Sequence, residues 1–156
     1  SGLADDEKWI DVNLERQTLV AYVGDRPVYA TLVSTGRILQ EGDPELDRRT
    51  PPGDYRITSK HVATTMDGDN AADGPYSIED VPYVMYFNLA FALHSAFWHN
   101  RFGRTKSHGC VNLAPLDAKW VFAWTLPFVP QGWHGAYPDA QHPGTRVIIH
   151  GEAPRG

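Results

Sequence analysis

"WIDVNLERQTLVAYVGDRPVYATLVST" covers residues 9–35, and the hydrophobic spacing within it decides the fold class. Ile10, Val12 and Leu14 alternate with their neighbours at the two-residue period of a β-strand. The same period returns after each of two short polar turns, and "VYATLVST" is rich in the β-branched residues that strands favour. We expect an antiparallel meander of three strands, at residues 9–14, 18–23 and 28–35.

Later segments extend the strand pattern over most of the chain. The short segments "DYRITSK", "YVMYF", "FALH" and "GTRVIIH" predict strands at residues 54–60, 83–87, 91–94 and 144–150. Residues 36–53 carry many charges and prolines and are expected to form a loop. Residues 61–80 contain "MDGDNAADGP", which is too polar and glycine-rich to pack a core. We expect a second long loop there, and a structureless insertion of this length is usually functional or mobile.

The segment "PLDAKWVFAWTL", at residues 115–126, predicts the principal helix. Pro115 suits a first helical position, and Asp117 in the first turn complements the helix dipole. At helical spacing, one face collects four apolar residues: Leu116, Trp120, Ala123 and Trp124. The residues therefore predict one mostly β domain with a principal helix after Cys110.

Length, charge and hydropathy exclude several classes of protein. The chain has 156 residues, of which 42% are hydrophobic, and this is enough for one domain with a real core. No apolar run approaches the roughly 18 residues that span a membrane. The formal charge of −5 argues against nucleic acid as a partner, because nucleic-acid-binding domains are usually basic. The Ser1-Gly2 start resembles an expression scar, so we expect that an export signal or anchor upstream has been removed.

Cys110 lies in "KSHGCVNL" (residues 106–113) and is the only cysteine, so it cannot form a disulfide within the chain. A lone cysteine is most often a small buried hydrophobe. Here Gly109 permits tight backbone geometry beside the sulfur, and the predicted helix start favours a thiolate. A thiol with the ordinary pKa of about 8.5 needs such help, or a nearby base, to act as a nucleophile.

Histidines near Cys110 supply two candidate chemistries. His94 ends the predicted strand at residues 91–94, which would hold its ring rigidly near the cysteine. A histidine at a strand end is often structural, but a lone cysteine with a well-placed histidine makes a Cys–His nucleophile plausible. The alternative is zinc binding, although the spacing matches no zinc pattern that we can justify. Its four ligands would be His94, His99, His108 and Cys110.

At "HSAFWHNRFGRTKSHGCVNL" the chain resembles the L,D-transpeptidase catalytic domain family, also called YkuD-type. The family pattern is a histidine, about a dozen residues, and then Ser/Thr-His-Gly-Cys. Here twelve residues separate His94 from the "SHGC" of residues 107–110. "STG" at residues 34–36 and "TPPGDYRI" at residues 50–57 resemble a second family segment, STG…TPxGxYxI. The resemblance extends over residues 9–150, which is nearly the whole chain.

The resemblance implies a role for each residue of the motif. Cys110 matches the nucleophile, and His94 matches the general base or ion-pair partner. The backbone carbonyl of Ser95 matches the acceptor that holds the imidazole in its tautomer. The N–H groups of Gly109 and Cys110 match the oxyanion hole. Two further positions that shape the site are matched by Ser107 and His108.

Further residues are expected to contact the substrate. Asn112 stands where many family members have arginine and another subset has asparagine, and its amide can donate and accept hydrogen bonds. Trp98, Trp133 and Tyr86 are expected to line two arms of the cleft, although each could equally belong to the core. The polar segment 61–80 is expected to form a lid or wall over the cleft, or else a solvated loop without a role.

The family also implies a fold and a reaction. The fold is mostly β, with sandwich-like mixed sheets and one main helix, over residues 8–151, with residues 1–7 and 152–156 as tails. The reaction is acyl transfer on peptidoglycan stem peptides: Cys110 attacks the carbonyl of the third residue of a donor tetrapeptide, and terminal D-Ala leaves. An amine of a second stem then captures the acyl group, which builds the cell wall and its shape.

The expected setting follows from the same resemblance. No metal or organic cofactor is expected, and carbapenem-type inhibitors are expected to acylate Cys110. The family acts outside the cytoplasmic membrane, so we expect the periplasm or cell envelope. A monomer is the expected oligomeric state, although no residue pattern fixes it.

Two other functions fit the same residues. If water captures the acyl group in place of an amine, the protein is an L,D-carboxypeptidase or endopeptidase with an identical first half-reaction. A non-catalytic cell-wall binding module with an idle Cys110 is the other alternative. The presence of both His94 and Cys110 argues against that module.

Overall fold

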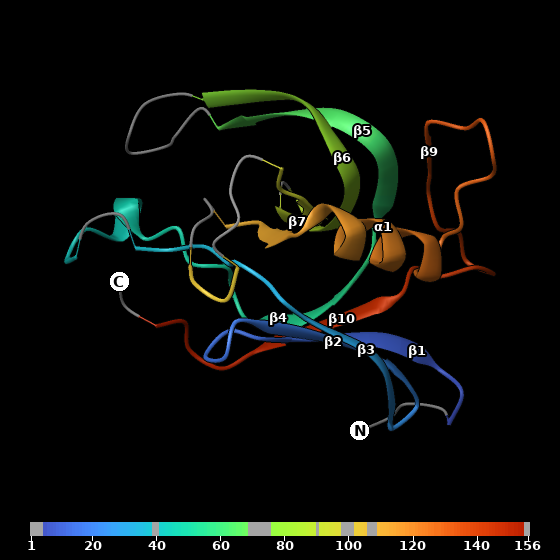
Figure 1. Cartoon of the computed structure of the whole chain (residues 1–156), viewed down its shortest axis with the longest axis horizontal. Coiled ribbons are helices and arrows are strands. Elements are labelled where there is room, and N and C mark those ends of the chain that lie inside the picture. The colour runs from blue at the N-terminus through green and yellow to red at the C-terminus, as the bar shows by residue number, and fades with distance from the viewer. Residues whose placement is uncertain are drawn as a thin grey trace.

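The computed structural model describes residues 5–38, 41–68, 76–89, 91–97, 102–105 and 109–154. Within these residues the chain forms two five-stranded sheets with one α-helix between them (Figure 1). Strand order is β3-β2-β1-β10-β4 in the first sheet and β8-β7-β6-β5-β9 in the second. In chain order the elements are β1 (Lys8–Asn13), β2 (Thr18–Val23), β3 (Arg26–Leu32), the 3-10 helix η1 (Pro44–Leu46), β4 (Gly53–Arg56), β5 (Ser59–Gly68), β6 (Tyr76–Asn88), β7 (Phe91–Ser95), β8 (Val111–Leu113), α1 (Pro115–Trp124), β9 (Gly135–Ala136) and β10 (Arg146–His150).

The first sheet contains the predicted meander. β1 pairs antiparallel with β2, and β2 pairs antiparallel with β3. β10 returns to pair parallel with β1, so this sheet is mixed, as expected. β7 and β8 form a parallel pair in the second sheet, which is therefore mixed too. The mostly β, sandwich-like fold class is confirmed. Among the described residues, no helix has the length and apolar character that a membrane span requires.

The segment predicted as one strand at residues 54–60 is two strands in different sheets. β4 pairs with β10 in the first sheet, whereas β5 pairs with β6 in the second. Between them, the Ile57 N–H donates to the Thr145 carbonyl at 2.9 Å, and the Thr58 N–H donates to the Tyr86 carbonyl at 2.7 Å. Two successive amides thus bond to opposite sheets. The prediction was wrong because alternation does not reveal where a chain changes sheet.

The prediction of a loop over residues 61–80 was also wrong. β5 continues to Gly68 and β6 begins at Tyr76, and the two pair antiparallel as a long hairpin that curls over β7 (Figure 1). Backbone hydrogen bonds form whatever the polarity of the side chains, so a ribbon paired mainly with itself needs no apolar alternation. Residues 69–75 lie outside the described residues.

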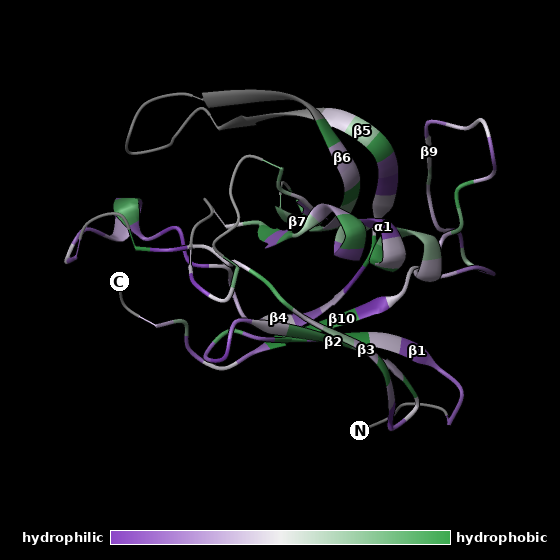
Figure 2. Ribbon diagram, in the orientation of Figure 1, coloured by the Kyte–Doolittle hydropathy of each residue, from purple (hydrophilic) through white to green (hydrophobic). Residues whose placement is uncertain are grey.

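The core lies between the sheets and includes one face of α1. Its buried helical residues are Ala118, Val121 and Phe122. On the apolar face noted in the sequence, Leu116 is 81% exposed and Ala123 is also exposed, whereas Trp120 and Trp124 are partly buried and pack against the core. The buried side of α1 packs against β6 and β7. On the other apolar side of the helix, the Trp120 ring stacks on both Tyr29 and Trp124. Figure 2 shows the hydrophobic residues in the strands of both sheets and in α1.

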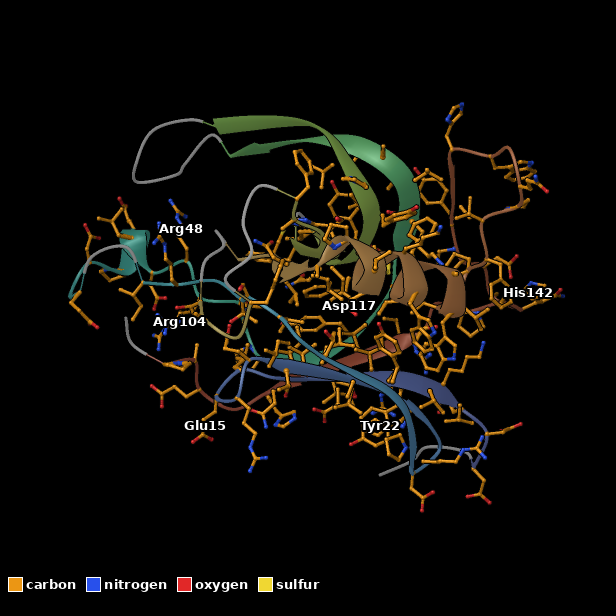
Figure 3. All side chains as sticks on the ribbon, viewed as in Figure 1. Glu15, Tyr22, Arg48, Arg104, Asp117 and His142 are labelled. Atoms are coloured by element: carbon orange, nitrogen blue, oxygen red, sulfur yellow. The ribbon has the colours of Figure 1, made fainter. Side chains whose placement is uncertain are left out.

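The first turn of α1 is held by the first sheet. In its first turn, Asp117 faces β3 (Figure 3) and accepts hydrogen bonds from the hydroxyls of Tyr29 and Thr31. The hydrogen bond to Asp117, followed by burial, raises the pKa of Tyr29 to about 12. The Tyr29 ring also stacks on Trp120, with 4.1 Å between ring centroids. The acidic first turn thus fixes the helix against the first sheet.

At the other end of α1, the fully buried Lys60 of β5 caps the helix. Its ammonium donates to the carbonyls of Phe122 and Thr125, the latter at 2.8 Å, and lies 4.5 Å from the Phe122 ring centroid. Lys8 donates to the Trp124 carbonyl at 3.2 Å. Burial, with a smaller contribution from Lys8, lowers the pKa of Lys60 to about 7. Helix carbonyls without an intrahelical partner are therefore bonded by two lysines.

Candidate active site

Strand pairing places the candidate active-site residues His94 and Asn112 on one face of the second sheet. β7 and β8 are parallel neighbours in which Leu93 pairs with Val111 and His94 pairs with Asn112. Leu93 and Val111 belong to the hydrophobic core. Because side chains alternate between faces, His94 and Asn112 point to the opposite face of the sheet. Both are nearly fully buried, at 4% and 3% exposure.

Cys110 immediately precedes β8 and lies on the same face as His94. It packs against a small cluster formed by Val81, Val84 and Ala92, with Tyr86 at its edge. Ala92 stands two residues before His94 on β7, so the two share a face. The structure therefore brings together Cys110 and His94, as well as Tyr86 from β6. Residues 81–86 of β6, which follow the segment predicted as a lid or wall, supply one side of this site.

The His94 ring is held by its own neighbour. Its Nδ1 lies 2.8 Å from the Ser95 carbonyl oxygen. A carbonyl can only accept, so this contact requires a proton on Nδ1. In the neutral ring the proton-free nitrogen is then Nε2, the atom that could take a proton from a thiol. The contact that the resemblance implied for Ser95 is present.

The thiol environment differs from the prediction. Burial raises the pKa of Cys110 to about 11, and a hydrogen bond from the Ala92 backbone acts in the opposite direction. We expected the helix start to favour a thiolate, but α1 begins only at Pro115. The helix dipole acts mainly within its first turn, and the apolar wall from β6 and β7 dominates. At neutral pH the thiol is therefore protonated and needs a base at the moment of attack.

Gly109 has the tight geometry that the sequence predicted. Its φ is +119°, in a region that residues with a side chain rarely adopt. A Cβ atom at this position would lie 2.1 Å from a ring carbon of Phe91. The backbone beside the sulfur can pass under this ring only with a glycine.

The two upstream motif segments contact the cysteine loop directly. Ser34 and Asn112 exchange two backbone hydrogen bonds, at 3.0 and 2.8 Å. The Thr50 hydroxyl donates to the Gly109 carbonyl at 2.7 Å and accepts from the Gly36 N–H at 2.9 Å. The "STG" segment (34–36) and the "TPPG" segment (50–53) are therefore in direct contact with the backbone of the cysteine loop, residues 109–112. The sequence offered no signal for this link beyond the presence of the two motifs.

The predicted aromatic residues are dispersed. Tyr86 adjoins Cys110, and its pKa is raised by burial and, secondarily, by the charge of Cys110. The sequence did not predict a row of rings that begins at Tyr86. In it the His61 ring lies between Tyr86 and Tyr137, with centroid distances of 5.7 Å and 6.0 Å. Trp133 is 62% exposed and precedes β9, at the opposite edge of the sheet from β8. Four predicted residues lie outside the described ones: Trp98, His99, Ser107 and His108.

The sequence and the fold agree with one family. The family model of the L,D-transpeptidase catalytic domain, YkuD, matches residues 7–149. The chain belongs to the L,D-transpeptidase catalytic domain family. None of the curated proteins is a significant match to it.

Solved structures with this fold include three L,D-transpeptidases. A C442S mutant from Enterococcus faecium is 23% identical with a TM-score of 0.68, and the match covers 92% of this chain and 50% of that one. The catalytic domain from E. faecium is also 23% identical, with a TM-score of 0.66 and coverage of 96% and 100%. LdtMt1 in complex with imipenem is 23% identical, with a TM-score of 0.68 and coverage of 93% and 59%. The chain thus spans about half the length of the first of these proteins and all of the isolated catalytic domain.

Proposed function

We propose that this L,D-transpeptidase domain cross-links peptidoglycan stem peptides through an acyl-enzyme on Cys110. The observation that carries the proposal is the His94 ring, which is fixed by the Ser95 carbonyl at 2.8 Å and lies on the face that holds the thiol. A protonated thiol beside an oriented neutral imidazole is an arrangement for general-base catalysis. An idle cysteine in a binding module would not require that orientation.

The proposed reaction uses these groups in turn. His94 Nε2 takes the thiol proton while Cys110 Sγ attacks the carbonyl carbon at the L-centre of the third stem residue. The resulting oxyanion accepts hydrogen bonds from the N–H groups of Gly109 and Cys110. As the tetrahedral intermediate collapses, the C–N bond breaks and His94 returns the proton to the leaving D-Ala amine. A second stem amine then attacks the thioester, and the thiol is restored.

The site of action and the inhibitors are part of the same proposal. A protein that acts on peptidoglycan works in the periplasm or cell envelope. Imipenem is bound by LdtMt1, which has the same fold. We therefore expect a carbapenem to acylate Cys110 and to leave a mass adduct on the protein.

The test is a product analysis with a defined donor. The protein is incubated with a disaccharide-tetrapeptide while an acceptor stem is titrated, and the products are identified by mass spectrometry. Cross-linked dimer should rise with acceptor and overtake the tripeptide. A dominance of tripeptide at saturating acceptor would identify a carboxypeptidase. An unchanged tetrapeptide would favour a binding module.

A further inference from the structure

Thr50 makes two hydrogen bonds behind the cysteine loop, and both bond backbone groups. The residue is 1% exposed. Its hydroxyl hydrogen is donated to the Gly109 carbonyl at 2.7 Å, and its oxygen accepts from the Gly36 N–H at 2.9 Å. Because the hydroxyl both donates and accepts, the position of its hydrogen is set by these two partners.

The Gly109 carbonyl belongs to the same peptide group as the Cys110 N–H. A peptide group is planar, and its C=O and N–H point in opposite directions. The hydrogen bond from Thr50 to the oxygen therefore also fixes the direction of the Cys110 N–H, away from Thr50. Donation to the carbonyl also polarises the group, and this strengthens the N–H as a donor.

The peptide is also confined on two sides, so its orientation depends on close neighbours. Phe91 covers one side of Gly109, where an added Cβ would lie 2.1 Å from its ring. Gly36 covers another, and a Cβ on Gly36 would lie 2.8 Å from the Gly109 Cα and 1.8 Å from the Arg48 carbonyl oxygen. Gly109 has a φ of +119°, which residues with a side chain rarely adopt, and the Thr50 hydroxyl adds a directed hydrogen bond to a peptide that these neighbours already confine.

We infer that Thr50 is a positioning residue that aims the Cys110 N–H at the developing oxyanion. The inference rests on the proposed function, since it requires acyl transfer at Cys110. It gives the upstream "TPPG" segment a part in the chemistry, although Thr50 need not touch the substrate. It also explains why the segment begins with a residue that carries a hydroxyl.

The test compares two reactions of the same thiol in the whole chain. Imipenem is attacked at its β-lactam carbonyl, where the C–N bond breaks, the ring nitrogen takes the proton from the thiol, and an oxyanion forms on the way. Iodoacetamide is attacked at its CH₂ carbon, where iodide leaves and no carbonyl oxyanion forms. Only the first reaction uses the Cys110 N–H. Both rates are read as mass adducts on the folded protein.

Thr50→Val should slow acylation by imipenem about 10–100-fold, below the roughly 10²–10³-fold cost of removing an oxyanion donor outright. Its alkylation by iodoacetamide should stay within about twofold of wild type, and Thr50→Ser should recover most of the acylation rate. Thr145→Val is the matched control, because this 3% exposed threonine also bonds a backbone group, the Leu126 N–H at 2.7 Å, far along the chain from Cys110. It should leave both rates unchanged.

The remaining outcomes would contradict either the positioning role of Thr50 or the proposed acylation of Cys110. If Thr50→Val acylates like wild type, or if both reactions slow in parallel, Thr50 does not aim the peptide. If Thr50→Val does not fold, Thr50→Ala removes the same hydroxyl and is measured in the same way. If wild-type Cys110 is alkylated but never acylated, the proposed function fails, and this inference fails with it.

Discussion

On one face of the second sheet, Leu93 and Val111 enter the core beside the buried Lys60. On the other face, His94 and Asn112 lie in the same two strands beside Cys110. The ammonium of Lys60 is held by helix carbonyls, whereas the His94 ring is held by the carbonyl of the next residue. Alternation in the second sheet therefore separates Lys60, which caps α1, from the residues of the proposed chemistry. The comparison predicts that activity and stability can be changed independently from the two faces.

Cys110→Ala should have the largest effect on activity and little effect on stability. The change removes the proposed nucleophile, so turnover of tetrapeptide and acylation by imipenem should both fall to background. Its small side chain lies at the edge of a minor cluster, so the melting temperature should change little. Product analysis and thermal unfolding measure the two quantities. Substantial turnover by this variant would disprove the assignment of Cys110.

His94→Ala should reduce the acylation rate by about 10²–10⁴-fold, the usual contribution of a general base. The reason is that the thiol is protonated at neutral pH and loses the acceptor for its proton. His142→Ala is the control: this histidine is 76% exposed and bonds Asp139 on a surface loop (Figure 3). It should leave the rate unchanged. Equal losses in both variants would contradict a specific role for His94.

The pH dependence of thiol labelling should reflect the buried environment of Cys110. Its pKa is raised to about 11, so the thiolate fraction grows about tenfold for each pH unit below that value. Alkylation by iodoacetamide should therefore rise steeply between pH 7 and 10 in His94→Ala, where no base assists. A plateau near neutral pH in that variant would show that the thiolate is stabilised after all.

The sequence predicted the elements whose side chains alternate against the core. β1, β2 and β10 were found this way, because each has one buried face. β3 was predicted from its β-branched residues and has only half-buried and exposed side chains. The β5–β6 hairpin was missed because its outer part pairs only with itself and needs no apolar pattern. The division of residues 54–60 between two sheets was missed because it depends on which amide bonds to which sheet.

The site was predicted in part, and only where the resemblance supplied it. The pairing of His94 with the Ser95 carbonyl came from the family pattern and is present in the structure. The direction of the Cys110 pKa shift was wrong, because the wall formed by Val81 and Val84 cannot be read from local sequence. The bond from Thr50 to Gly109 joins residues 59 positions apart, and no spacing rule predicts such a contact.

Lys60→Met should affect stability and spare activity, as the core face requires. It removes the donors to two helix carbonyls, and leaving such buried groups unsatisfied costs about 1–3 kcal/mol. The free energy of unfolding should fall by this amount, measured by urea denaturation, while acylation of the folded protein stays unchanged. Lys119→Met, an exposed change on α1, is the matched control. A loss of acylation in Lys60→Met would show that the two faces are coupled.

The same residue predicts a pH dependence of stability. The folded pKa of Lys60 is lowered from 10.5 to about 7, so between these values the unfolded chain binds more protons than the folded chain. Stability contributed by Lys60 should therefore rise with pH across this window. A neutral amine keeps two N–H donors, so both carbonyl contacts survive deprotonation. Lys60→Met should lack this rise, and an identical slope in wild type and variant would contradict it.

Tyr29→Phe should give the smallest effect and the most sensitive test of the separation. It removes one hydrogen bond to Asp117 while Thr31 still donates to the same carboxylate at 2.7 Å, so the expected loss is about 0.5–1.5 kcal/mol. The phenyl ring of the variant can still stack on Trp120. Tyr137→Phe, at a residue that is 72% exposed, is the control for loss of a phenol hydroxyl alone.

Asp117 lies only seven positions after Cys110, at the start of α1, so any movement of the helix would reach β8 first. Urea denaturation should detect the loss, and imipenem acylation should be unchanged. A slower acylation would mean that the position of α1 sets the position of the cysteine, and that the two faces are separate only at the Lys60 end.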